Sequence, residues 1–222
     1  HEQSRELFQL VQQGLTSIKR GERVIVEAMN EVSNKPVDPK TFSYLPATKT
    51  TQKAIDEGFE ALSAKNKVCF VVIKDFIFKA EETLYIFILF NLIKNALYYF
   101  KDCPQAVLTI TVDGNTNTVK VRDTGPGIPP HMLSRLFTSF VTAGKEGGTG
   151  LGLAYCKRTM QAFGGDITCD SVVNEFTEFT LSFPKVMPQE LEAYNKEKLK
   201  KARSYLQGKS ILIVDDLASV RK

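Results

Sequence analysis

The sequence has 222 residues, 43% of them hydrophobic, and a formal net charge of +4 at pH 7, which is the composition of an ordinary soluble protein. The charge is small and scattered, which argues against nucleic-acid binding, and the four cysteines form no C-x-x-C pair that would indicate a zinc site or a disulfide framework. The longest apolar run, residues 84–93, falls short of the roughly 18 residues that cross a bilayer, so we expect no membrane contact from this segment.

The chain begins with a predicted long helix. Residues 5–33 place apolar side chains at helical spacing, and Pro36 and Pro39 end the pattern because proline cannot continue a helix. A further helix is predicted over 48–62, followed by two short strands within 68–78 that are separated at Lys74-Asp75. The apolar stripe of the first helix needs a partner helix, which this sequence does not supply.

A second long helix is predicted over 81–100, and it carries two asparagines. Asn91 and Asn95 are four residues apart, so both project from one helix face. They are either two polar positions on an exposed face or, among residues that are almost all apolar, oxygen ligands for a divalent cation on a triphosphate.

Residues 107–112 and 118–123 alternate around Gly114-Asn115, which predicts a hairpin whose second strand ends at Asp123. Asp123 is followed by Thr-Gly-Pro-Gly-Ile. An aspartate beside glycines is commonly a turn former. The alternative is a fixed carboxylate that accepts a hydrogen bond from an exocyclic amine and so selects adenine over guanine.

Glycines are concentrated at positions 125, 127, 148, 150 and 152. They are either ordinary surface turns or a phosphate-binding loop, because glycine lets the backbone approach a ligand and a helix follows. That helix is predicted from 151 to 163, ending at Gly164-Gly165. A short helix is predicted to begin at Pro129-Pro130, and the glycine-rich loop over 141–149 is expected to be mobile and to close over nucleotide.

The last part of the chain predicts two strands, a helix and one more strand. The two strands cover 166–172 and 176–183, and the charged residues 189–206 form a linker helix. Residues 210–216 have the pattern of a buried strand that ends in Asp215-Asp216.

Five short motifs in this order resemble the boxes of the histidine-kinase ATP-binding domain. They are Asn91-x-x-x-Asn95, DTGPGI at 123–128, LFTSF at 136–140, GGTGLGLA at 147–154 and Thr177-Glu178-Phe179. The resemblance covers roughly residues 65–185, and GGTGLGLAYCKRTMQAFGG is similar to quorum-sensing sensor kinases of bacteria. It implies a two-layer α/β sandwich of the Bergerat (GHKL) type and transfer of the γ-phosphoryl group of ATP to histidine.

The resemblance also implies roles for individual residues. The expected catalytic residues are Asn91 and Asn95, with Asn95 on magnesium, and the expected nucleotide-binding residues are Asp123, Gly125, Gly127, Phe137, Gly148, Gly150, Leu151, Gly152 and Thr177. Tyr98 departs from the family, which often has a basic residue there, near the phosphates.

By the same resemblance, residues 1–35 would be the second helix of a dimerisation hairpin, 36–188 the catalytic domain, 189–208 a linker helix and 209–222 the first strand of a receiver domain. The parent protein would then be a homodimeric hybrid kinase that passes phosphate to a receiver domain or response regulator. This part of it would lie in the cytoplasm, and the full-length protein could be anchored in the inner membrane by another segment. We interpret His1 as a tag remnant or chance terminal residue, because no Pro-Leu follows His1-Glu2, and expect the phosphoacceptor histidine outside the chain.

The sequence leaves two alternatives to a kinase. The first is a nucleotide-binding regulatory module with a phosphatase or relay role and little kinase turnover. A hydrolysing ATPase is disfavoured, because related ATPases carry Glu where Asn91 stands.

Overall fold

The computed structural model of the chain describes residues 37–59, 67–141 and 150–207. These residues fall into two compact units, one ending at Lys185 and one beginning at Val186, and each is described by itself. The long helix predicted at the N-terminus, most of the glycine-rich loop with Gly148, and the strand predicted over 210–216 lie outside the described residues.

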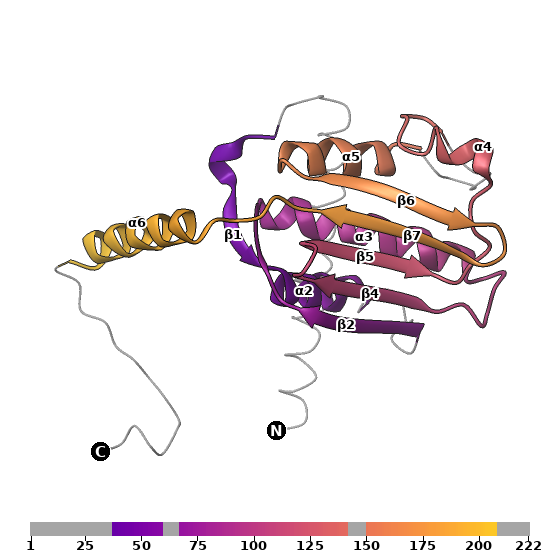
Figure 1. Cartoon of the computed structure of the whole chain (residues 1–222), viewed down its shortest axis with the longest axis horizontal. Coiled ribbons are helices and arrows are strands. Elements are labelled where there is room, and N and C mark those ends of the chain that lie inside the picture. Colours follow the sequence, from indigo (N-terminus) through magenta and orange to yellow (C-terminus); the bar gives the residue numbers. More distant parts are fainter. Residues whose placement is uncertain (1–36, 60–66, 142–149, 208–222) are drawn as a thin grey trace, which may run out of the picture. The chain divides into compact units, whose positions relative to one another are not determined.

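A five-stranded sheet forms one layer of the first unit (Figure 1). In spatial order its strands are β2 (Val68–Lys74), β4 (Leu108–Asp113), β5 (Thr118–Asp123), β7 (Phe176–Ser182) and β6 (Asp166–Val172). All neighbours are antiparallel except β2 and β4, which run parallel. The predicted hairpin β4–β5 is confirmed, and the two strands predicted over 166–172 and 176–183 form and pair antiparallel.

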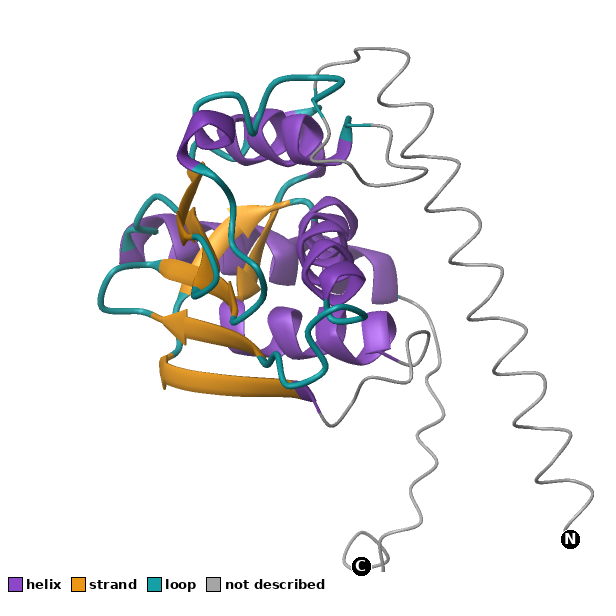
Figure 2. Ribbon diagram, turned by 90° about the vertical axis from the view of Figure 1, so that its right-hand side faces the viewer, coloured by secondary structure: helices purple, strands orange, loops and turns teal. Residues whose placement is uncertain are grey.

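Helices cover one face of this sheet, which we call the inner face (Figure 2). They are α2 (Ala47–Phe59), α3 (Glu82–Tyr99) and α5 (Gly152–Ala162). Burial alternates along β4 and β7, as expected for strands with one face on a core. The α3 helix is apolar nearly all round and lies in the centre, with nine buried residues. The predicted two-layer α/β arrangement is confirmed.

The sequence patterns missed a second, two-stranded sheet. In it β1 (Ser43–Pro46) pairs antiparallel with β3 (Ile77–Ala80), so the two strands predicted within 68–78 belong to different sheets. Asp75 separates them, and its carboxylate accepts hydrogen bonds from the backbone N–H groups of Thr48 and Phe76 at 2.8 and 2.9 Å. Asp75 therefore follows the end of β2, and its side chain also binds a backbone N–H in the first turn of α2.

An aromatic cluster joins the small sheet to α3. The ring centroid of Phe78 lies 4.4 Å from that of Phe183 and 4.7 Å from that of Tyr85. The Tyr85 hydroxyl is fully buried and lies 2.6 Å from the Thr51 hydroxyl of α2, which gives this polar group a partner inside the core.

The remaining described elements are short or lie in the second unit. They are the 3-10 turn Pro39–Thr41, the helix α4 (Pro130–Leu133) and the helix α6 (Pro188–Leu206). The helix predicted over 189–206 therefore forms, and none of its residues is buried. Among the described helices, none has the length and apolar character needed to cross a membrane.

The buried hydroxyl pair gives a stability prediction. Tyr85→Phe should lower the free energy of unfolding by about 1–3 kcal/mol, because the Thr51 hydroxyl stays buried without its partner. The double variant Tyr85→Phe/Thr51→Val removes both polar groups and should cost less than the sum of the single changes. Urea unfolding of the four proteins measures this coupling, and strict additivity would contradict it.

Candidate functional site

A row of polar side chains crosses the inner face of the sheet at one end. Asp123 is the last residue of β5 and pairs in register with Thr177 on β7, which in turn pairs with Ser171 on β6. These side chains are 8%, 6% and 9% exposed, respectively. The inner face is otherwise apolar, so three buried polar side chains at one end of the sheet indicate a candidate binding site there.

Asp123 is held by the loop that follows it. The backbone N–H of Gly125 donates a hydrogen bond of 2.9 Å to Oδ1 of Asp123. Burial raises the pKa of this carboxyl group above its ordinary value, and the Gly125 hydrogen bond and the nearby Arg122 offset part of that effect. A Cβ at position 125 would lie 2.7 Å from Oδ1, so glycine is needed for this approach.

Two further side chains near Asp123 were not predicted from the sequence. Burial raises the pKa of Tyr99, at the end of α3, with added contributions from Tyr98 and the charge of Asp123. Burial also raises the pKa of Cys169 to about 12, and the charges of Asp170 and Asp123 add to that shift. Their nearness to Asp123 depends on pairing between distant parts of the chain, which no local pattern indicates.

The DTGPGI loop requires its second glycine. Gly127 has a φ of +67°, and a Cβ there would collide with the carbonyl oxygen of Val172 on β6. The loop therefore lies directly against the β6–β7 hairpin. The Asn174 N–H donates 2.8 Å to the Pro126 carbonyl, and the Ile128 N–H donates 2.8 Å to the Ser171 hydroxyl.

The asparagines of α3 differ in their surroundings. Asn91 is 9% exposed, and its Nδ2 donates a hydrogen bond of 3.1 Å to the carbonyl of Phe87. Its Oδ1 faces α5, because a Cβ built at Gly152 would lie only 2.7 Å from it. Asn95 is partly exposed, one turn further along α3. The exposed-face interpretation of Asn91 is therefore wrong, since its side chain is buried between two helices.

The start of α5 has the features of an anion site. Gly150 has a φ of +70°, and its carbonyl accepts a 2.9 Å hydrogen bond from the Phe140 N–H. The helix begins at Gly152, after Leu151, whose apolar side chain cannot accept hydrogen bonds from the first turn. Backbone N–H groups of a first turn attract negative charge, and here Asn91 adds an oxygen beside them.

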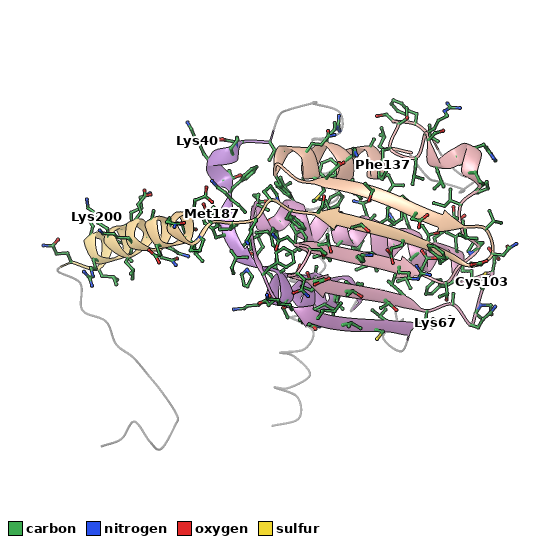
Figure 3. All side chains as sticks on the ribbon, in the orientation of Figure 1. Lys40, Lys67, Cys103, Phe137, Met187 and Lys200 are labelled. Carbon is green, nitrogen blue, oxygen red and sulfur yellow. The ribbon has the colours of Figure 1, made fainter. Side chains whose placement is uncertain are left out.

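Phe137 packs between the sheet and α5 (Figure 3). Its ring meets the ring of Phe179 on β7 edge-on at 6.5 Å, and Nζ of Lys157 lies 5.3 Å from its centroid. Lys157 also contacts Asp166 at 2.6 Å. Phe137 is one of the predicted nucleotide-binding residues, and its contacts with Phe179 and Lys157 hold the described residues after α4 against the core.

The predicted residues thus form two groups connected by α3. One contains Asp123, Gly125, Gly127 and Thr177, and the other joins Asn91 to the start of α5 at Gly152. Among the described residues, no cluster of three or more His, Cys, Asp or Glu side chains could hold a metal ion. Amide oxygens are hard ligands, so asparagine beside bound phosphates fits magnesium, which keeps several waters.

The buried carboxylate gives a prediction about pH. The pKa of Asp123 is raised in the folded protein, so unfolding releases its proton at pH values above the ordinary carboxyl pKa. The free energy of unfolding should therefore fall as pH rises from 3.8 through the raised value. The free energy of unfolding of Asp123→Asn should not show this decrease, because asparagine does not titrate. Urea unfolding from about pH 4 to pH 7 compares the two proteins, and equal slopes would contradict the prediction.

Sequence comparison finds relatives among sensor kinases. The chain is 37% identical over 179 residues to the autoinducer 1 sensor kinase/phosphatase LuxN of Vibrio campbellii, covering 79% of this chain and 21% of LuxN. It is 33% identical over 212 residues to the CAI-1 autoinducer sensor kinase/phosphatase CqsS of Vibrio cholerae, covering 95% of this chain and 31% of CqsS. The chain thus spans about a fifth to a third of these curated relatives.

Solved structures show the same fold. The catalytic domain of histidine kinase ThkA superposes with a TM-score of 0.55 at 24% identity, covering 65% of this chain and 95% of that one. Full-length ShkA in complex with AMPPNP gives a TM-score of 0.54 at 19% identity, covering 79% of this chain and 40% of that one. At these identities the likeness concerns the fold alone.

Residues 80–187 match the family described as histidine kinase-, DNA gyrase B-, and HSP90-like ATPase. This range contains α3 with its asparagines, the DTGPGI loop, the start of α5 and the β6–β7 hairpin. The family membership predicted from the five motifs is confirmed. The chain carries a catalytic domain of this ATPase family, of the kind found in sensor histidine kinases.

Proposed function

We propose that this domain binds ATP with magnesium and transfers the γ-phosphoryl group to a histidine side chain. The observation that carries the proposal is the buried carboxylate of Asp123, which is fixed by Gly125 and placed in one row with Thr177. A buried acceptor of this kind suits a donor with two hydrogens, such as the exocyclic amine of adenine. The ATP-binding family to which residues 80–187 belong supports the same ligand.

At the adenine end, Asp123 accepts from the amine, while Gly125 and Gly127 shape the loop around it and Thr177 lies on the neighbouring strand. Guanine has a carbonyl oxygen at the corresponding ring position. That oxygen would face the carboxylate without a hydrogen between them, so the site should discriminate against GTP.

At the phosphate end, the first turn of α5 offers backbone N–H groups from Gly152 onward, and Gly150 and Leu151 lead into this turn. Gly148, which precedes them in the sequence, is proposed to bind phosphate with them. Asn91 lies beside it. Asn95, one turn along α3, would hold the magnesium ion together with phosphate oxygens and water. The ion, when bound, neutralises charge on the phosphates.

The reaction depends mainly on positioning. A nitrogen of the acceptor imidazole forms a bond to the γ-phosphorus, the bond to the bridging oxygen breaks, and ADP leaves with that electron pair. Asn91, Asn95 and the start of α5 orient the triphosphate for this step. The contacts of Phe137 with Phe179 and Lys157 hold the described residues after α4 in place.

The wider arrangement is part of the proposal. Residues 1–35 supply half of a dimerisation hairpin, 36–188 the catalytic domain, 189–208 a linker helix and 209–222 the start of a receiver domain. The phosphoacceptor histidine then lies outside this chain. The phosphoryl group passes on to an aspartate of a receiver domain or response regulator, and the chain works in the cytoplasm as part of a homodimer.

A second function, removal of phosphate, is favoured by one observation. LuxN and CqsS are both named sensor kinase/phosphatases. The nucleotide site would then also set the balance between phosphate addition and removal. Steady hydrolysis of ATP is not proposed, because Asn91 has no ionisable group to activate water.

The first test is calorimetry of ATP binding with magnesium. The unchanged chain should bind ATP, and Asp123→Asn should weaken binding by at least about tenfold, because an amide cannot replace a charged acceptor. Transfer of labelled phosphate to an added histidine-bearing helical hairpin then separates the kinase from a regulatory module. ATP binding without any transfer would leave only the regulatory function.

The start of α5 gives a further prediction. Gly152→Ala places a methyl group against Oδ1 of Asn91 and so displaces this oxygen from the start of α5. Loss of the polar contact that this oxygen would make in the ATP complex should weaken ATP binding about tenfold. Alanine suits a helix, so the nucleotide-free protein should keep its melting temperature within a few degrees. Thermal unfolding and calorimetry measure both quantities. Unchanged ATP affinity would remove Asn91 and this turn from the phosphate site.

A further inference from the structure

Ser171 of β6 is a buried hydroxyl with partners on two sides. It accepts a 2.8 Å hydrogen bond from the Ile128 N–H at the end of the DTGPGI loop. It donates a 2.6 Å hydrogen bond to the carbonyl of Phe176 on β7. Its oxygen also lies 3.3 Å from the Thr177 hydroxyl. One small side chain thus connects the loop, both strands of the hairpin and the row that contains Asp123.

The hydrogen bonds of Ser171 are directional. A serine hydroxyl has one proton, and the short contact to the Phe176 carbonyl uses it. The oxygen lone pairs are then left to accept the Ile128 N–H and to face Thr177. Alanine at this position would leave the Ile128 N–H without this acceptor. Threonine keeps the hydroxyl and can form the same bonds.

The start of the loop is held by contacts that do not involve Ser171. Thr124 exchanges two hydrogen bonds with Val107, at 2.9 and 3.1 Å, and the Gly125 N–H is bound to Asp123. Toward the end, the loop rests on the β6–β7 hairpin through Asn174 and Ser171. Ser171 is the side chain that provides this second anchor, since the Asn174 contact is made by backbone atoms alone.

The hairpin is itself supported from the other face of the sheet. The Arg122 guanidinium lies 3.7 Å from the centroid of the Phe176 ring, and Arg122 also contacts Glu178 at 3.4 Å. Phe176 therefore has its ring held on the outer face while its carbonyl is bound by Ser171. The hydroxyl of Ser171 is therefore bound to a carbonyl whose residue is itself held in place by Arg122.

We propose that Ser171 is a positioning residue for the nucleotide, which fixes the end of the DTGPGI loop relative to Asp123 and Thr177 through its hydrogen bonds to Ile128 and Phe176. This inference rests on the proposed function of the same site. Ser171 acts on the nucleotide through the loop and does not contact it. The loop keeps its anchor at Thr124 without Ser171, so the fold survives while the shape of the adenine end is lost.

The test compares Ser171→Ala, Ser171→Thr and the control Ser182→Ala. Ser182 donates its hydroxyl to the Asp166 carbonyl at 3.3 Å, across the same two strands at the opposite end. Ser171→Ala should raise the Kd for ATP about 3- to 10-fold, the effect of one lost hydrogen bond. Ser171→Thr should recover most of that loss, and Ser182→Ala should bind as the unchanged chain does.

Hydrogen exchange of the nucleotide-free protein separates positioning from general destabilisation. In Ser171→Ala, the amides of Gly125, Gly127 and Ile128 should exchange faster while the amides of α3 keep their protection. Faster exchange throughout the protein would overturn the inference. So would an unchanged Kd in Ser171→Ala, or an equal loss in Ser171→Ala and Ser171→Thr. Absence of ATP binding by the unchanged chain would instead refute the proposed function itself.

Discussion

A carboxylate buried in the inner face of the sheet is the constraint on which the site depends. Asp123 is 8% exposed and is the last residue of β5, whose other inner-facing residues are apolar. Burial of charge is unfavourable unless the charge is hydrogen-bonded, and within the described part of the chain the backbone N–H of Gly125 supplies that hydrogen bond. Burial raises the pKa of Asp123, and the Gly125 hydrogen bond and Arg122 offset only part of that rise. In the proposed function, the remaining acceptor capacity of Asp123 is used by the ligand.

The surrounding loop keeps this arrangement through backbone geometry. Gly127 takes a left-handed conformation against Val172, and Ser171 and Asn174 hold the loop on the hairpin. Few of these contacts involve large side chains. A site that depends on backbone positions changes little when surface residues change, but it tolerates little change at the glycines.

The elements with strong local patterns could be predicted from the sequence, and so could the motif residues. Alternation around Gly114 indicates a hairpin because both strands lie within sixteen residues. The pairing of β1 with β3 and the parallel pairing of β2 with β4 were not predictable, since they join distant segments. Ser171 and Tyr99 were missed for the same reason. A serine in an alternating strand looks like any other polar residue until its partner, Ile128, is known.

The two ends of the site differ in how ready they are for a ligand. At the proposed adenine end, Asp123 already accepts a hydrogen bond from the backbone N–H of Gly125 in the loop. At the other end, the Asn91 amide nitrogen is bound to its own helix, and the amide oxygen lies beside the first turn of α5. An oxygen there complements the positive end of that helix in the absence of nucleotide. In the proposed function, an incoming phosphate would take over this role, and the oxygen of Asn91 would then be left to face a cation.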